Sequence, residues 1–369
     1  MPLHRNLGRK VRPLVSASMS DALQHHIAAA VDRYLATAPD APAACVAIDA
    51  PAGAFAVSRG LADPATGEAM TADHAVRIAS CTKTFVAASV LQLAADGALH
   101  LDQPALAVAP PAAGELLQRF EHGHTITIRQ LLQHRSGMVD HNSFPASLQG
   151  PSFEWTALAQ LAIAVEQPAL FAPGTAYSYS DSGYILLGQI VEGLTGDTLA
   201  GAVRRHTRLD ELDVSSIHWE RVEPTPAGLR SAHQFHDGPT ADDWNDTLDW
   251  NPTLDLFGGG GMVATMPDMA TWWTALFEGR AHPHLAQQLA DPQPAIGPDG
   301  VDTGDEVGLG IFRHHVDGAA VWSHGGYWGL RTFHVPAVQT SVALVVTAKG
   351  ANVPAPRLLA DDIVRALVA

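Results

Sequence analysis

The chain has little cysteine, few charged residues and no long apolar run. Its two cysteines cannot supply a disulfide framework. No apolar run reaches the ~18–20 residues that a membrane-spanning helix requires. The sequence holds 22 basic and 38 acidic residues, and the resulting net charge of −16 argues against nucleic acid or an anionic membrane as a partner. A composition of 47 % hydrophobic and 16 % charged residues indicates a compact globular protein instead.

A secretory signal is also missing from the first twenty residues. They carry four basic side chains but no apolar core of ~7–15 residues, which a signal peptide needs. We therefore expect residues 1–20 to form a flexible N-terminal extension. On the same grounds we expect the protein to be cytoplasmic.

The nineteen histidines do not form a recognisable metal motif. Some lie in close pairs, as in His122-x-His124 and His282-x-His284. The sequence contains no His-Glu-x-x-His helix, and no nearby carboxylate completes a ligand set. We expect these histidines to lie in solvated loops, and we expect neither a metal nor another cofactor.

A Ser-x-x-Lys motif is the first feature that points to chemistry. Ser80 and Lys83 precede an apolar run at helical spacing that ends at Gly97. Because residues i and i+3 share one face of a helix, the Lys83 amine can reach the Ser80 hydroxyl and take its proton. Unpaired backbone N–H groups at the helix start would also point at developing negative charge. The motif is short and common, so an isolated copy is far more often an N-cap serine followed by an exposed lysine one turn later.

Two further motifs follow in the sequence. Tyr-Ser-Asp occupies residues 179–181, just before an apolar stretch with helical spacing. His-Gly-Gly occupies residues 324–326, near the C-terminus. Together with Ser-x-x-Lys, these motifs indicate a serine nucleophile with partners from distant parts of the chain.

The three motifs, in this order, resemble those of the penicillin-recognising serine hydrolases. That family includes class C β-lactamases, DD-peptidases, esterases, and D-amino-acid amidases and aminopeptidases. Leu-Leu-Gln-His-Arg-Ser-Gly at 131–137 and the four glycines at 258–261 also resemble segments of the family. The resemblance extends from about residue 40 to 350. The sequences Arg-Ile-Ala-Ser-Cys-Thr-Lys at 77–83 and His-Arg-Ser-Gly at 134–137 are most similar to the corresponding motifs of D-amino-acid amidases.

The resemblance and the order of the expected elements predict an α+β fold of the β-lactamase/transpeptidase type. We expect helices at 21–36, 128–134, 154–165, 182–194 and 267–278, with another at the C-terminus. We expect strands at 45–48, 54–58, 308–312, 320–322, 331–335 and 341–347. One domain would cover residues 21–369. It would have a sheet lobe from about 21–75 and 256–369, a mainly helical lobe at about 76–255, and a cleft between them.

The resemblance also implies roles in a two-step acyl transfer. Ser80 would attack the carbonyl carbon, while Lys83 and Tyr179 would transfer protons. The sequence leaves open which of these two is the base, since neighbouring groups titrate as a unit. The backbone N–H groups of Ser80 and Tyr327 would form the oxyanion hole. His324 would be a further catalytic residue.

The residues expected to bind substrate are Asp181, Gly325, Gly326, Tyr327 and Trp250. The two glycines either form a tight turn or let substrate approach the backbone closely. Trp250 belongs to an acidic and aromatic stretch at 231–257 that contains no lysine or arginine. This stretch is either a solvated loop or a border of the cleft.

Two positions depart from the family pattern. Asp181 stands where asparagine is usual, and His324 stands where lysine is usual. The site therefore gains an anion and can lose a cation at neutral pH. A substrate carboxylate about 4 Å from Asp181 would be disfavoured by several kcal/mol at an effective dielectric constant of ~20. We therefore expect an ester, or an amide with an α-ammonium group, as substrate.

Four functions stay open on this sequence. We rank first a serine hydrolase of small esters or amides, and second a D-amino-acid amidase or D-aminopeptidase. A β-lactamase is third. A penicillin-binding module that is acylated without turnover is the alternative from another functional class. The sequence does not indicate stereochemical preference or oligomeric state.

Overall fold

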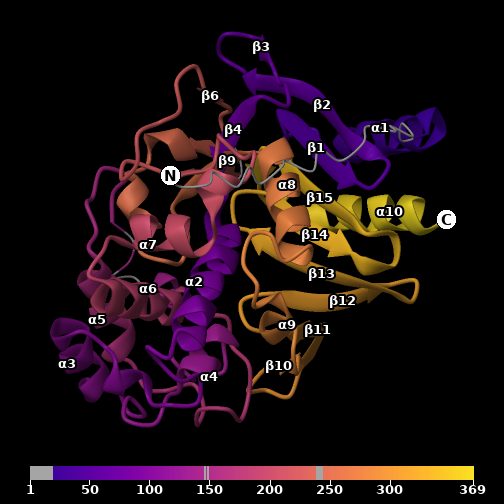
Figure 1. Cartoon of the computed structure of the whole chain (residues 1–369). Coiled ribbons are helices and arrows are strands. Elements are labelled where there is room, and N and C mark those ends of the chain that lie inside the picture. The colour runs from indigo at the N-terminus through magenta and orange to yellow at the C-terminus, as the bar shows by residue number, and fades with distance from the viewer. Residues whose placement is uncertain (1–19, 145–146, 148, 238–243) are drawn as a thin grey trace, which may run out of the picture.

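A nine-stranded sheet is the main feature of the computed structural model, which describes residues 20–144, 147, 149–237 and 244–369 (Figure 1). Its strand order is β10-β11-β12-β13-β14-β15-β1-β2-β3, and neighbouring strands are antiparallel throughout. The bounds are β1 Ala43–Ala50, β2 Gly53–Asp63, β3 Glu68–Ala69, β10 Gln293–Ile296, β11 Asp302–Val307, β12 Phe312–Val316, β13 Ala319–Gly326, β14 Leu330–Val335 and β15 Thr340–Val346. The β1–β15 pair therefore joins the two ends of the chain in one sheet.

The central strands β1 and β15 separate two apolar cores. Successive side chains of a strand point to opposite faces, so Val345 lies in one core and Val346 in the other. The helix α8 (Met266–Phe277) packs on one face of the sheet. The helices α1 (Asp21–Ala36) and α10 (Pro356–Val368) lie side by side on the other face (Figure 1). Both faces are covered, which explains why the sequence of β15 is apolar almost throughout.

Helices α2 to α7 stand together beside the sheet, with α2 on the side of the group nearest the sheet (Figure 1). The bounds are α2 Lys83–Ala95, α3 Pro111–Arg119, α4 Ile128–Leu132, α5 Ala157–Val165, α6 Asp181–Thr195, α7 Leu199–His206 and α9 Leu285–Gln288. The helix α2 contacts α6, α7 and α9, and most of its side chains are buried. A helix enclosed by protein is apolar all round rather than on one face, as this sequence is.

Two small sheets complete the structure. One has the order β5-β9-β4-β6 and the other β16-β7-β8. Their bounds are β4 His74–Arg77, β5 His218–Trp219, β6 Arg230–Ser231, β7 Phe235–Asp237, β8 Trp244–Asp246, β9 Met262–Thr265 and β16 Ala348–Lys349. The strand β4 ends three residues before Ser80, so its pairing with β9 fixes where the Ser-x-x-Lys segment begins.

The predicted α+β class is confirmed, as are most of the expected elements. The expected helices correspond to α1, α4, α5, α6, α8 and α10, and five of the six expected strands correspond to β1, β2, β13, β14 and β15. The prediction of a strand at 308–312 is wrong, because a turn with a left-handed residue at Gly310 (φ +76°) separates β11 from β12. The apolar Leu309 and Ile311 in this turn are buried in the core that contains α2.

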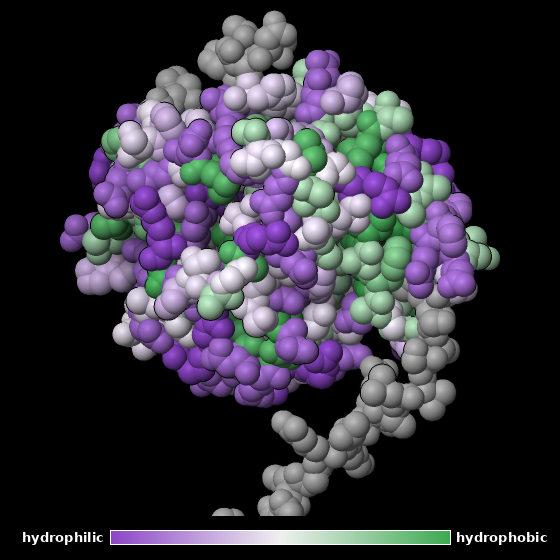
Figure 2. Space-filling model, turned by 90° about the horizontal axis from the view of Figure 1, so that it is seen from above, coloured by the Kyte–Doolittle hydropathy of each residue, from purple (hydrophilic) through white to green (hydrophobic). Residues whose placement is uncertain are grey.

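The surface seen from above carries mainly hydrophilic and intermediate side chains, with smaller apolar patches between them (Figure 2). No helix in the described part of the chain is long and apolar enough to cross a membrane. Residues 1–19 of the expected N-terminal extension lie outside the described residues. The division into a sheet lobe and a helical lobe, and the cytoplasmic location, stay predictions.

Candidate active site

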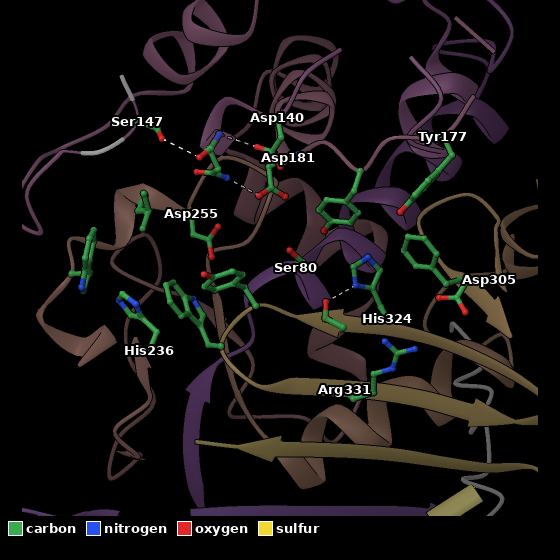
Figure 3. A pocket seen from close by; sticks show the side chains of 18 of the residues that line it. Ser80, Asp140, Ser147, Tyr177, Asp181, His236, Asp255, Asp305, His324 and Arg331 are labelled. Carbon is green, nitrogen blue, oxygen red and sulfur yellow. Dashed lines mark hydrogen bonds between the residues drawn. The ribbon is translucent and has the colours of Figure 1, made fainter. Parts of the chain in front are cut away.

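A cavity of about 780 Å³ lies where the C-terminal end of β13 meets the helical part of the molecule (Figure 3). It brings together residues from all three sequence motifs. The predicted site residues that line it are Ser80, Tyr179, Asp181, Trp250, His324, Gly325 and Tyr327. Of the other two, Lys83 is fully buried and bonded to Ser80, and Gly326 packs against the chain just before Ser80.

Ser80 lies in a 3-10 turn that leads directly into α2. The turn covers Ala79–Thr82, and α2 begins at Lys83. Side chains at positions i and i+3 of a 3-10 turn lie almost above one another. The Lys83 Nζ is accordingly 3.0 Å from the Ser80 Oγ. The predicted contact between serine and lysine is therefore present, with a tighter turn than an α-helix.

Lys83 is enclosed by oxygen atoms. Besides Ser80, its Nζ donates hydrogen bonds to a carboxylate oxygen of Asp181 and to the carbonyl oxygen of Gly259. These three acceptors match the three donors of an ammonium group. The side chain has no exposed surface. The alternative of an exposed lysine following an N-cap serine is therefore wrong.

Three carboxylates, Asp140, Asp181 and Asp255, lie close together on one side of Ser80, and we call them the acidic cluster (Figure 3). The side chain of Asn142 donates to Asp181 at 3.0 Å. Burial, followed by repulsion from Asp181, raises the pKa of Asp140 to about 6. The same two causes raise the pKa of Asp255 to about 6. Above pH 6 the cluster therefore carries more negative charge than Lys83 alone can neutralise.

Tyr179 keeps its proton at neutral pH. Burial, followed by the negative charge of Asp181, raises the pKa of its phenol well above the usual value. Its buried hydroxyl has no hydrogen-bond partner of normal geometry among the described residues. Its interaction with the Ser80 hydroxyl lowers the pKa only in part, so the phenol stands protonated beside Ser80 at the wall of the cavity.

His134 holds the backbone on both sides of Tyr179. Its carbonyl oxygen accepts from the N–H of Ser178 at 3.0 Å, and its Nδ1 accepts from the N–H of Ser180 at 3.1 Å. Its ring stacks on the ring of Tyr179, with 4.3 Å between the centroids. Burial, followed by the charge of Lys83, lowers the pKa of His134 well below its usual value, so Nδ1 is free to accept. We infer that His134 is a positioning residue for Tyr179.

His134→Ala is expected to lower kcat for p-nitrophenyl acetate by about tenfold or more, because Tyr179 loses its support. His134→Asn should recover part of the loss. Asparagine tolerates the left-handed conformation found at this position (φ +52°), and its side-chain oxygen can replace Nδ1 as the acceptor. Steady-state kinetics measures both effects, and circular dichroism checks the fold.

The control for this experiment is His282→Asn, a change at a buried histidine bonded to Gln288 in another part of the chain. It should leave kcat unchanged. In a Tyr179→Phe background the His134→Ala effect should shrink, because the two residues act together. Equal losses for the two His134 variants, or an undiminished loss in that background, would exclude the positioning role.

His324 is a neutral imidazole with one open nitrogen. Burial, followed by the charge of Lys83, lowers its pKa to about 3. Its Nδ1 lies 2.8 Å from the carbonyl oxygen of Gly325, which requires the proton on Nδ1. The buried Nε2 is left as an acceptor without a partner among the described residues. A neutral His324 supports the expectation that this position carries no positive charge at neutral pH.

The glycines after His324 have different surroundings. Gly325 lines the cavity. A Cβ on Gly326 would lie 2.5 Å from the carbonyl oxygen of Ile78, so only glycine lets β13 approach the segment before Ser80. The ring of Tyr327 is half exposed at the cavity rim, with the Lys349 Nζ 3.2 Å from its centre.

The stretch at 231–257 borders the cavity, which favours the second of its two interpretations. Four described residues of the stretch line the cavity, namely His236, Trp250, Leu254 and Asp255. Arg77, three residues before Ser80, pairs with Glu220 at 2.7 Å and donates to the carbonyl oxygen of Trp250 at 3.0 Å. An arginine from another part of the chain therefore anchors this acidic stretch. Residues 238–243 lie outside the described residues.

Sequence reasoning missed several residues that line the cavity. They are Asp140, Asn142, Tyr177, Asp255, Asp305 and Arg331. Asp255 could have been predicted, because it belongs to the acidic stretch at 231–257 that the sequence analysis had identified. Arg331 could also have been predicted, because it is the one charged residue of the expected strand at 331–335. Asp140 lies in a loop without a motif, and no sequence signal points to it.

A comparison with protein families finds one family that matches most of the chain. Residues 24–365 match the family model described as Beta-lactamase. Esterase EstB of Burkholderia gladioli is 33 % identical over 193 residues, which are 49 % of this chain and 46 % of that protein. D-aminopeptidase of Brucella canis is 26 % identical over 325 residues, which are 81 % of this chain and 57 % of that protein. The chain thus spans about half the length of the curated relatives it matches.

Solved structures show the same fold. D-amino acid amidase from Ochrobactrum anthropi SV3, complexed with L-phenylalanine amide, superposes with a TM-score of 0.80 at 23 % identity, over 94 % of this chain and 99 % of that one. A penicillin binding protein from Bacillus halodurans gives a TM-score of 0.71 at 21 % identity, over 95 % of this chain and 99 % of that one. These likenesses confirm the predicted β-lactamase/transpeptidase-like fold. With the match of the family model over most of its length, the chain belongs to the β-lactamase family.

Proposed function

We propose that the protein is a serine hydrolase that cleaves small esters or amides through an acyl-enzyme at Ser80. The observation that supports this most is the 3.0 Å contact between the Ser80 Oγ and the Nζ of the buried Lys83. A serine bonded to a desolvated lysine at the wall of an open cavity is the arrangement of an activated nucleophile. Relatives named as an esterase and a D-aminopeptidase support the same class of reaction.

The reaction proceeds in two steps. The Ser80 Oγ forms a bond to the substrate carbonyl carbon, and the bond from that carbon to the leaving alcohol or amine breaks. The serine proton passes through the Lys83–Tyr179 pair to the leaving group. Water then attacks the acyl-enzyme, which releases the acid and returns the proton to Ser80. The protonated Tyr179 fits the donor to the leaving group, and Lys83 fits the acceptor of the serine proton once its ammonium group has released a proton of its own.

The charge of the cavity favours a second, narrower function, the hydrolysis of aminoacyl amides or peptides. The acidic cluster can hold the α-ammonium group of an amino acid. The neutral His324 adds no positive charge that would repel this ammonium group. Several of the similar proteins, among them the D-aminopeptidase and the D-amino acid amidase, are named for substrates of this kind. We therefore propose a D-amino-acid amidase or D-aminopeptidase as the second candidate.

A parallel rate panel tests the proposal. It compares p-nitrophenyl acetate and butyrate, the amides of D- and L-phenylalanine, and nitrocefin. We expect steady turnover of the esters or the amino-acid amides, and slower turnover of nitrocefin. A burst of p-nitrophenol without steady turnover would favour the penicillin-binding module, and no reaction with any substrate would contradict the proposal.

The preference for cationic substrates should depend on pH. Asp140 and Asp255 have pKa values of about 6, so they are protonated at pH 5 and ionised at pH 7. A substrate ammonium with a pKa of about 8 stays charged over this range. The ratio of kcat/KM for phenylalanine amide to that for N-acetylphenylalanine amide should therefore rise between pH 5 and 7, by about tenfold.

Ammonia release measures both substrates, for each enantiomer. Other effects of pH on the catalytic groups act on both substrates and cancel in the ratio. Asp255→Asn should flatten the rise, because one of the two titrating groups is gone. A ratio that does not change with pH in the wild type would contradict a role of the acidic cluster in binding ammonium.

A further inference from the structure

Gln234 is a buried amide that joins two segments of the active site. It lies between β6 and β7, and 1 % of its surface is exposed. Its Oε1 accepts from the backbone N–H of Arg77 at 2.8 Å. Its Nε2 donates to the carbonyl oxygen of Trp328 at 3.0 Å and to that of Arg77 at 3.2 Å. One side chain therefore ties the strand β4, which leads to Ser80, to the turn between β13 and β14.

The two tied segments carry the N–H groups that are expected to form the oxyanion hole. Ser80 follows Arg77 by three residues, and Tyr327 directly precedes Trp328. An oxyanion hole stabilises the reaction only if both N–H groups lie within hydrogen-bond distance of the same oxygen atom. Ser80 and Tyr327 come from distant parts of the chain, so contacts between their segments must fix the distance between the two N–H groups.

Close packing at Gly326 limits how near the two segments can come. A Cβ at this residue would lie 2.5 Å from the carbonyl oxygen of Ile78, so the two backbones already touch. The Cys81 thiol also reaches across, to the carbonyl oxygen of His324 at 3.7 Å, but a thiol is a weak donor. The amide of Gln234 bonds to both segments and so limits how far they can move apart.

The backbone just before the nucleophile also needs support. Ala79 has a φ of +46°, a left-handed conformation that residues other than glycine rarely adopt. Such a conformation persists only where the surrounding structure imposes it. The peptide plane between Ala79 and Ser80 contains the N–H of Ser80, so this conformation decides where that N–H points. Gln234 holds both the N–H and the carbonyl oxygen of Arg77, two residues before Ala79.

We propose that Gln234 is a positioning residue that fixes the distance between the two N–H groups of the oxyanion hole. This rests on the proposed function and deepens it. When the Ser80 Oγ bonds to the carbonyl carbon, an electron pair of the C=O bond moves to the oxygen, and it returns when the leaving group departs. Gln234 is not among the described residues that line the cavity, so it acts on this oxygen only through the backbone that it holds.

Two matched esters, p-nitrophenyl acetate and p-nitrophenyl thionoacetate, test the proposal. The second carries sulfur in place of the carbonyl oxygen, and a sulfur anion accepts N–H hydrogen bonds poorly. For each ester, kcat/KM reports the acylation of Ser80. The ratio of kcat/KM for the oxygen ester to that for the sulfur ester should be higher for the wild type than for hydroxide in solution. Gln234→Met keeps the size of the side chain but loses the amide, so this ratio should fall by about tenfold or more.

Gln234→Glu supplies a reversible form of the same change. A protonated carboxyl can still accept from Arg77 and donate to the carbonyl oxygen of Trp328, whereas an ionised carboxylate has no donor. Burial raises the pKa of a carboxyl group. The ratio should therefore lie within about threefold of the wild-type value at pH 5 and fall by about tenfold as the pH rises to about 8. Effects of pH on Lys83 and Tyr179 act on both esters and cancel in the ratio.

Gln288→Met is the matched control, at another buried glutamine, whose side chain bonds to His282 at 3.1 Å. It should keep the wild-type ratio, and circular dichroism identifies a variant that does not fold. An unchanged ratio in a folded Gln234→Met protein, or a ratio in Gln234→Glu that does not respond to pH, would overturn the positioning role. So would a wild-type ratio no higher than that of hydroxide, a result that needs no variant. No turnover of p-nitrophenyl acetate by the wild type would contradict the proposed function instead.

Discussion

Ser80→Ala is expected to abolish turnover of every substrate and labelling by a fluorophosphonate probe. The rate should fall by about 10⁴-fold or more, because the acyl-enzyme cannot form. Ser80 is the serine whose hydroxyl contacts a lysine amine in the described part of the chain. The sequence contains no Gly-x-Ser-x-Gly elbow that could supply another nucleophile. The measurement is steady-state hydrolysis of p-nitrophenyl acetate, with mass spectrometry of the labelled protein.

Ser147 offers a matched control within the same cavity. Its hydroxyl donates to the carbonyl oxygen of Phe144 at 2.8 Å, and no lysine among the residues that the structure describes contacts it. Ser147→Ala should still be labelled by the probe at Ser80. Hydrolysis at the wild-type rate by Ser80→Ala would refute the acyl-enzyme mechanism. Labelling of Ser80→Ala at another serine would refute the assignment of the nucleophile.

The contact between Ser80 and Lys83 was predictable because it is local. Ser80 and Lys83 are three positions apart in one turn, and the geometry of that turn fixes their relative positions. The turn could be recognised from the apolar run that follows it. The position of Tyr179 relative to them was not local, and it came from the resemblance to a family. A spacing of 99 residues carries no geometry by itself, since distant parts of a chain meet only through the fold.

The electrostatics of the site could be predicted only in part. Asp181 and His324 were singled out because they depart from a motif. The remaining charges, Asp140, Asp255 and Arg331, come from a loop, an acidic stretch and a strand that meet only in the folded chain. Their effect depends on burial, which no sequence pattern gave. A charge argument that counts only motif residues therefore omits most of the field in the cavity.

The prediction of a strand at 308–312 was wrong for a related reason. The apolar residues Leu309 and Ile311 alternate with glycine and imitate a strand pattern. A Cβ at Gly310 would lie 2.4 Å from the Ala87 Cβ of α2, so glycine is required by close packing against a distant helix. Tertiary contacts thus decide a local structure that alternation alone assigns wrongly.

Tyr179→Phe should lower kcat by about 10²–10⁴-fold while leaving the protein at least as stable as the wild type. The substitution removes a buried hydroxyl that has no hydrogen-bond partner of normal geometry among the described residues, so folding loses no such interaction. Loss of activity without loss of stability would indicate a chemical role for the phenol. Thermal unfolding and steady-state kinetics on the same preparation measure both quantities. A large fall in melting temperature would point to a structural role instead.

Lys83→Met should lower kcat by a similar factor, about 10²–10⁴-fold, but it should also destabilise the fold. Asp181 then loses a buried cation that bonds to it, and a carboxylate left unpaired inside a protein is costly. The loss of stability should be greatest above pH 6, where Asp140 and Asp255 are also ionised, and smaller at pH 5, where they are protonated. Unfolding measured at both pH values separates this electrostatic cost from lost packing.

The double variant Lys83→Met/Tyr179→Phe decides whether the two residues form one proton relay. If they do, the second substitution removes a partner that the first has already made useless. The combined loss in kcat should then be close to the larger single loss, far below the product of the two. Losses that multiply would mean that Lys83 and Tyr179 act in separate steps. In that case the contact of Lys83 with Ser80 would serve only to hold the nucleophile, and the base would have to be sought among the acidic cluster.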